Sequence, residues 1–82
     1  MYEVEFSESA LKELNKLEKN IQYRIVKTLE RIRVRPEAYV TKLVGYDSYR
    51  LRVGEYRVIM EINKNKLFIL IIKIGHRRNI YQ

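Results

Sequence analysis

The chain has 82 residues with no cysteine, one histidine and a formal net charge of +7. The lack of cysteine excludes a disulfide-stapled scaffold and, with a single histidine, a metal site built from cysteines or several histidines. A length of 82 residues suits one domain. We therefore expect a single domain over residues 1–82, held by one hydrophobic core. The longest apolar run, Leu67–Ile72, is too short for a membrane span of roughly 20 residues. The N-terminus lacks the basic and apolar regions of a signal peptide. We therefore expect a cytoplasmic protein with no membrane partner.

The first half of the chain predicts a strand followed by two helices. Alternating apolar residues over 2–6 indicate a strand with one buried face. Ser7 then offers a helix cap, and apolar residues at helical spacing extend to about Glu18. Asn20 is expected to cap a second helix, whose apolar stripe runs to about Val34. The break between the helices is so short that they should form a tight hairpin.

The middle of the chain predicts a loop and then a β-hairpin. Residues 36–48 show no regular period and are expected to form the one long loop, with a turn at Gly45. Residues 49–53 and 56–62 alternate between apolar and polar side chains, as strands with one buried face do. Between them, Gly54–Glu55 suits a two-residue turn of the type that begins with glycine.

The last predicted strand is the most apolar part of the chain. The run Leu67–Ile74 indicates a strand covered on both faces, and Gly75 is expected to break it before a short basic tail. The order strand, helix, helix, strand, strand, strand is typical of an α+β fold. We expect the N-terminal strand, the helical hairpin and a three-stranded antiparallel meander to form one sheet with the helices on one face and arginines on the other.

Positive charge is concentrated in the second half of the chain. Residues 1–41 hold eight Lys or Arg against seven Asp or Glu, whereas residues 42–82 hold nine against three. A basic surface confined to one part of a fold attracts polyanions through counterion release. Nucleic acid or the ribosome is therefore the expected partner, ahead of a membrane surface.

Three arginines are expected to share the exposed face of the β-hairpin. Arg50 and Arg52 alternate along one strand, and Arg57 can project from the same face of the next. Close like charges cost stability, which a bound anion offsets, and a guanidinium group binds phosphate through two donors. Spacing alone also leaves open a solvated sheet face that binds nothing.

The C-terminal tail adds His76, Arg77, Arg78 and Tyr81. Histidine and tyrosine can transfer protons, whereas arginine stays charged and can only stabilise negative charge. Any acid–base role therefore falls to His76 or Tyr81. Taken alone, a histidine and a tyrosine near a chain end are more often surface residues than catalysts.

Three short motifs and a late tyrosine follow one another along the second half: Lys42–Gly45 (KLVG), Tyr49–Val58 (YRLRVGEYRV), Ile74–Arg78 (IGHRR) and Tyr81. In this order and spacing they resemble the RelE family of toxin–antitoxin ribonucleases, and the expected order of elements matches a RelE-like fold over essentially the whole chain. The resemblance implies an mRNA interferase, an endoribonuclease that cleaves messenger RNA in the ribosomal aminoacyl site. In that mechanism the 2′-hydroxyl of the substrate attacks the adjacent phosphate, with no metal ion and no cofactor.

The resemblance also assigns roles to single residues. Arg57 and Arg77 match positions that stabilise the charged transition state, and Tyr81 matches a tyrosine that stacks on a base or transfers a proton. His76 is expected to take over part of the proton transfer. The remaining basic residues of the motifs are expected to bind RNA: Arg50, Arg52, Arg78 and Lys42.

The expected protein partner is a RelB-like antitoxin, with an acidic stretch, that folds as it covers the basic face and the tail. Two alternatives remain open at this point. A ParE-like toxin would share the fold and act on DNA gyrase without cutting RNA. A non-catalytic module that binds RNA or the ribosome would need only the basic patch.

Overall fold

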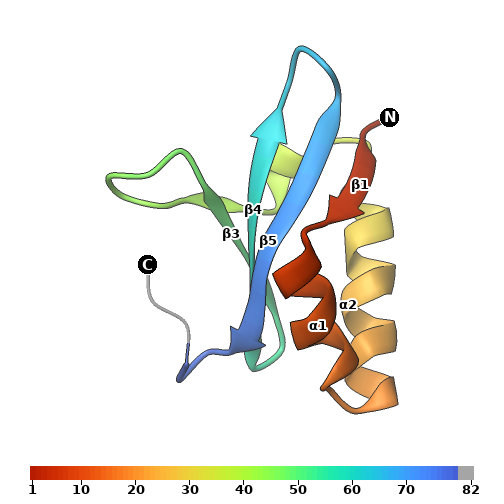
Figure 1. Ribbon diagram of the computed structural model, residues 1–82. Coiled ribbons are helices and arrows are strands. Elements are labelled where there is room, and N and C mark those ends of the chain that lie inside the picture. The colour runs from red at the N-terminus through yellow and green to blue at the C-terminus, as the bar shows by residue number, and fades with distance from the viewer. Residues whose placement is uncertain (80–82) are drawn as a thin grey trace.

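The computed structural model describes residues 1–79, and its elements follow the expected order. They are β1 (Glu3–Phe6), α1 (Glu8–Asn15), α2 (Lys19–Arg31), the 3-10 helix η1 (Pro36–Ala38), β2 (Thr41–Lys42), β3 (Tyr49–Val53), β4 (Tyr56–Asn63) and β5 (Phe68–His76). Figure 1 shows the helical hairpin packed on one side of the sheet. The α+β class and the helices on one face are therefore confirmed. Among these residues, no helix is long and apolar enough to cross a membrane.

The strands form one sheet in the order β1-β5-β4-β3-β2. β1 pairs with β5 in parallel, and every other neighbouring pair is antiparallel, so the predicted meander is confirmed within a mixed sheet. The segment expected to be one long loop also contains η1 and the edge strand β2. β2 pairs only Thr41 with Arg50 and Lys42 with Tyr49. Two residues are too few to leave an alternating pattern, which is why the sequence did not predict this strand.

The ends of the helices are set by local hydrogen bonds. Ser7 caps α1 as predicted, because its hydroxyl oxygen accepts the Ala10 N–H at 3.1 Å. α1 ends at Asn15, earlier than expected. Glu18, in an extended backbone conformation, is the residue that precedes α2, so the prediction that Asn20 caps this helix was wrong. The second helix likewise stops at Arg31, before the predicted end.

The core lies between the helices and one face of the sheet. Its most buried side chains, each at most 3% exposed, include Ile25, Leu29, Ile32, Val58, Met60, Ile69, Ile71 and Ile74. The opposite face, called here the outer face, holds a much smaller apolar cluster in which Ile72 packs against buried Leu43 and Ile59. β5 is therefore fully covered only on the helix face, and its outer face is half-covered.

A bulge in β5 reverses which residues of this strand face the helices. The register shifts next to Ile59 and Met60, so that Met60 pairs with Ile71 while Val58 pairs with Ile74. Ile71 and Ile74 are three positions apart, yet both are buried in the core. An unbroken alternation would have turned Ile74 outward. Bulges of this kind re-aim the side chains that follow them.

Gly75 lies inside β5 and does not break it, contrary to the expectation from sequence. It pairs with Arg57, and His76 pairs with Tyr56 before the strand ends. Paired residues of neighbouring strands share a face of the sheet. Gly75 therefore lies on the outer face, and His76 lies on the helix face.

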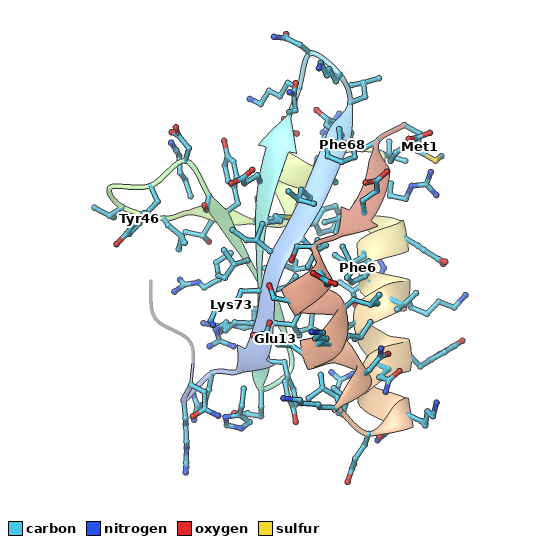
Figure 2. The ribbon with its side chains drawn as sticks, in the orientation of Figure 1. Met1, Phe6, Glu13, Tyr46, Phe68 and Lys73 are labelled. Atoms are coloured by element: carbon cyan, nitrogen blue, oxygen red, sulfur yellow. The ribbon has the colours of Figure 1, made fainter. Side chains whose placement is uncertain are left out.

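A helix residue covers the part of β5 that β1 leaves without a strand partner. β1 pairs with β5 only as far as Ile71. Beyond that point, Glu13 of α1 reaches the strand: Oε1 accepts the Ile74 N–H at 2.7 Å, and Oε2 lies 3.7 Å from Lys73 Nζ (Figure 2). This contact satisfies a backbone donor at an exposed sheet edge, and it ties α1 to the end of the strand that carries Gly75 and His76.

Candidate nucleic-acid interface

Three arginines lie on the outer face of the sheet, and a fourth, Arg77, follows the end of β5 close enough to Arg57 to repel its charge. Together they are called the arginine face: Arg50, Arg52, Arg57 and Arg77. Arg52 of β3 pairs directly with Arg57 of β4. Arg50 lies two positions along β3 from Arg52, on the same face. The prediction that these three share a face is confirmed by the register. Cβ atoms of directly paired residues are about 5 Å apart, so the charges are close.

The β3–β4 turn holds Arg77 beside the other three arginines. Gly54 has φ of 59°, a left-handed conformation that glycine adopts at little cost, and it allows the predicted two-residue turn. Glu55 then makes two contacts with Arg77. Its carbonyl oxygen accepts the Arg77 N–H at 2.8 Å, and its Oε1 lies 2.8 Å from Arg77 Nε.

The charges of the arginine face affect the pKa of Arg57. The pKa of Arg57 is lowered, first because the side chain is partly removed from water and then because Arg52, Arg50 and Arg77 repel its charge. Glu55 acts in the opposite direction and raises the pKa of Arg57. Repulsion of this kind disfavours the charged form of Arg57. A bound phosphate would offset it with a charge-assisted pair of hydrogen bonds.

His76 is not brought together with the arginine face. Its ring packs edge-on against Tyr56, with centroids 5.4 Å apart and an interplanar angle of 79°. Nδ1 accepts the Arg78 N–H at 3.2 Å. On the helix side it lines a surface pocket together with Glu13 and Lys16. The proposed proton-transfer role of His76 stays a prediction, and its position gives that role no support.

Of the remaining predicted site residues, Lys42 lies on the helix face, Arg78 directly follows Arg77, and Tyr81 is not described. Lys42 pairs with Tyr49, a residue of the helix face, with Nζ 5.9 Å from that ring centroid and 3.6 Å from an oxygen of Asp47. Arg78 is exposed just beyond the end of β5. Tyr81 lies outside the residues that the structure describes.

Glu55 is the residue at this site that sequence reasoning missed. From its place after Gly54 it was expected only to form half of a turn. It is nevertheless the one acidic residue within the basic motif from Tyr49 to Val58, and that isolation was the available signal. A carboxylate flanked by Arg52 and Arg57 in sequence is placed to organise guanidinium groups.

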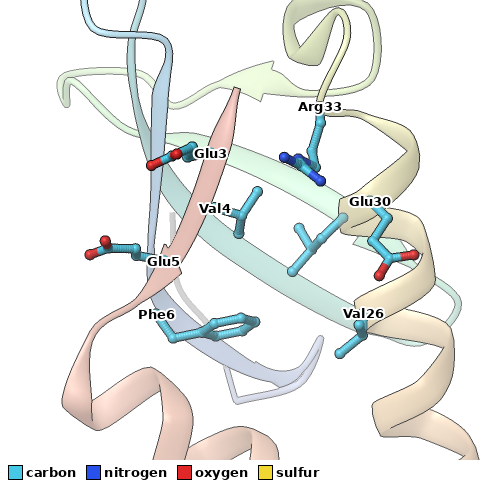
Figure 3. Close-up of a pocket in the computed structure, with 8 residues that line it drawn as sticks. Glu3, Val4, Glu5, Phe6, Val26, Glu30 and Arg33 are labelled. Atoms are coloured by element: carbon cyan, nitrogen blue, oxygen red, sulfur yellow. The ribbon is translucent and has the colours of Figure 1, made fainter. Parts of the chain in front are cut away.

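One groove of the molecule lies away from the arginine face. It has a volume of about 440 Å³ and runs between β1 and α2, where Val4 and Phe6 face Val26 across the gap (Figure 3). Glu3, Glu5 and Glu30 also line it. Against these three carboxylates the lining has one guanidinium group, that of Arg33, so its net charge is negative and does not suit RNA.

Comparison with known proteins agrees with this architecture. The family model for the ParE toxin of the type II toxin–antitoxin system parDE matches residues 4–81. The chain is 35% identical to a putative RelE-like toxin protein of Escherichia coli and 32% identical to the mRNA interferase toxin RelE of strain K12, in each case over 93% of this chain and 83% of the relative.

Solved structures of relatives show the same fold. The toxin chain in the crystal structure of the intact E. coli RelBE toxin–antitoxin complex superimposes with a TM-score of 0.78 at 32% identity. The match covers 93% of this chain and 96% of that one. The family match and the curated relatives span nearly the whole chain. The chain therefore belongs to the RelE/ParE superfamily of type II toxin–antitoxin toxins, as a member of its RelE family.

Proposed function

We propose that this toxin is a ribosome-dependent endoribonuclease that cleaves messenger RNA in the ribosomal aminoacyl site. The observation that carries the proposal is the arginine face, where four guanidinium groups converge without a matching set of carboxylates. Its relatives include an mRNA interferase at 32% identity, which supports the same activity. On this proposal the toxin acts in the cytoplasm, where ribosomes are.

The chemistry proposed here is an internal transfer of the phosphate. The 2′-oxygen of one nucleotide bonds to the adjacent phosphorus as its proton leaves, and the bond from phosphorus to the 5′-oxygen breaks as that oxygen takes up a proton. The products are a 2′,3′-cyclic phosphate and a free 5′-hydroxyl. Arg57 and Arg77 stabilise the extra negative charge that develops on the phosphate oxygens, while Arg50 and Arg52 hold the RNA backbone.

The proton transfers need groups other than arginine, because arginine does not deprotonate in proteins. Tyr81 is proposed for this role. His76 would have to act across the end of the sheet, because its ring packs on the helix side against Tyr56. Of the two, Tyr81 is the candidate that we would test first.

A RelB-like antitoxin is the proposed protein partner. Relatives of this chain have been solved as RelB–RelE complexes, and the arginine face offers a surface that an acidic segment would cover. Mixing the toxin with such an antitoxin should give one complex of higher mass in size-exclusion chromatography. Two separate peaks at micromolar concentration would argue against this partner.

The test of catalysis separates cleavage from binding. Arg57→Ala should lower ribosome-dependent cleavage by about 100-fold to 1,000-fold, the usual cost of removing one group that stabilises transition-state charge, while sedimentation with ribosomes changes much less. Arg31→Ala removes the same charge from the exposed end of α2 and serves as the matched control. Equal losses of cleavage and sedimentation in Arg57→Ala would favour a module that only binds RNA.

A second candidate function has one observation in its favour. The family model that matches residues 4–81 is that of the ParE toxin, and a ParE-like toxin would inhibit DNA gyrase. A supercoiling assay with purified gyrase tests this directly. Inhibition of supercoiling, combined with intact messenger RNA on ribosomes, would replace the ribonuclease proposal with this one.

A further inference from the structure

Glu55 binds Arg77 through both its backbone and its side chain. The Arg77 N–H donates to the Glu55 carbonyl oxygen at 2.8 Å, and Arg77 Nε lies 2.8 Å from Glu55 Oε1. No other residue among 1–79 makes a hydrogen bond or ion pair with Nη1 or Nη2 of Arg77. Within these residues, the carboxylate therefore contacts the inner nitrogen of the guanidinium group, and no further side chain ties down the two outer nitrogens.

We propose that Glu55 is a positioning residue, which orients the Arg77 guanidinium so that its two outer nitrogens meet the phosphate that is being cleaved. This inference rests on the proposed ribonuclease function and deepens it. Arginine has a long side chain with several rotatable bonds, and ordering it at the moment of reaction would raise the barrier. A carboxylate that orders the side chain beforehand lowers that cost.

The turn makes Glu55 a rigid support. Val53 pairs with Tyr56 directly before and after the turn, so only Gly54 and Glu55 connect the two strands. Glu55 also raises the pKa of Arg57, which places its charge near two of the four arginines. The turn thus fixes the acidic side chain of Glu55 among the basic groups of the arginine face, where it contacts Arg77.

A role in folding does not account for this pair. The side chains of Arg77 and Glu55 are 53% and 64% exposed. Ion pairs between side chains this exposed contribute little to stability because water and salt screen them. Glu55 should also repel the RNA backbone, so it would weaken substrate binding if it did nothing else. A positioning role predicts the opposite signature, a loss of turnover without a loss of substrate affinity.

The experiment measures kcat and KM for cleavage of messenger RNA on programmed ribosomes. Glu55→Ala should lower kcat by about tenfold to 100-fold, the range for a misplaced catalytic group, while KM stays unchanged or falls. Glu55→Gln keeps an oxygen that can accept the Arg77 Nε–H, so its kcat should lie between that of Glu55→Ala and that of the parent protein. Glu61→Ala removes an exposed carboxylate from β4 and, as the matched control, should stay within about twofold of the parent protein.

A double-mutant cycle identifies Arg77 as the residue through which Glu55 acts. In an Arg77→Ala background, Glu55→Ala should cause no further loss of kcat, because the group that it positions is gone. Additive losses would overturn the inference. In solution, the Arg77 Nε–H resonance should be resolved and slow to exchange in the parent protein and lost in Glu55→Ala. A resonance that is unaffected by the substitution would also overturn the inference.

The outcomes separate this inference from the proposed function. If the parent protein cleaves and Glu55→Ala cleaves as fast as Glu61→Ala, the positioning role is wrong and the ribonuclease function stands. If the parent protein does not cleave on ribosomes, the proposed function is wrong, and the positioning role of Glu55 is wrong with it.

Discussion

Removing the carboxylate of Glu13 should destabilise the fold by more than is usual for a partly exposed helix residue. Glu13 Oε1 accepts the part-buried Ile74 N–H at 2.7 Å, and Oε2 lies 3.7 Å from Lys73 Nζ. A hydrogen bond to a charged group contributes about 1.5–3 kcal/mol. The ion pair, with side chains 31% and 49% exposed, adds at most about 1 kcal/mol, and the higher helix propensity of alanine returns a few tenths of a kcal/mol.

We therefore expect Glu13→Ala to lower the free energy of unfolding by about 2–3 kcal/mol. In urea denaturation followed by far-UV circular dichroism, this loss corresponds to a midpoint lower by roughly 1–2 M. Glu13→Gln keeps an oxygen acceptor for the Ile74 N–H and should lose about half as much.

Glu30→Ala is the matched control, because Glu30 is also a helical glutamate with a lysine partner, Lys27 at 3.7 Å, but bonds no strand. It should cost less than about 0.5 kcal/mol. Equal midpoints for Glu13→Ala and Glu30→Ala would refute the reasoning, because they would mean that the bond to the strand edge contributes nothing.

Three further predictions follow from the arginine face and its turn. Desolvation and repulsion by the other arginines lower the pKa of Arg57 in the folded protein, so the charge of Arg57 destabilises the fold. Arg57→Gln should therefore raise the urea midpoint, and 0.5 M salt should reduce the difference in midpoint between the variant and the parent protein. Binding of single-stranded RNA, followed by fluorescence anisotropy, should give a slope of log K against log salt concentration of about −3 for four phosphate contacts. Arg52→Ala should make this slope shallower by about 0.7, and an unchanged slope would show that Arg52 does not contact RNA. Gly54→Ala should cost about 1–2 kcal/mol in the same urea assay, since φ is 59° and the added Cβ would lie 3.0 Å from Arg24 Nη2; a neutral effect would show that the turn tolerates side chains.

The sequence predicted the architecture because most of it follows local rules. Alternation marked β3 and β4, helical spacing marked α1 and α2, and Ser7 marked the start of α1 through its hydroxyl. β2 escaped prediction because it exists only through pairing with β3. Asn20 was a plausible cap by residue type, but the residue that precedes α2 is Glu18, and the helix begins at Lys19.

The candidate site was predictable only in part, because its geometry depends on partner strands. The shared face of Arg50, Arg52 and Arg57 follows from alternation within one hairpin. The side on which His76 lies depends on the bulge in β5, which is defined by the register against β4. Alternation counted through β5 without the bulge would assign the residues after Ile71 to the wrong faces. The contact between Glu55 and Arg77 joins two segments that no local pattern connects.

The central claim is that the arginine face cleaves messenger RNA on the ribosome. The most direct measurement is primer extension on a messenger RNA held in a programmed ribosome, with the purified toxin, its Arg77→Ala variant and a ribosome-free control. The expected result is discrete cuts at the aminoacyl-site codon that require the ribosome and weaken by about 100-fold or more in the variant. Intact messenger RNA in every lane, under conditions where the toxin is folded and bound to ribosomes, would contradict it.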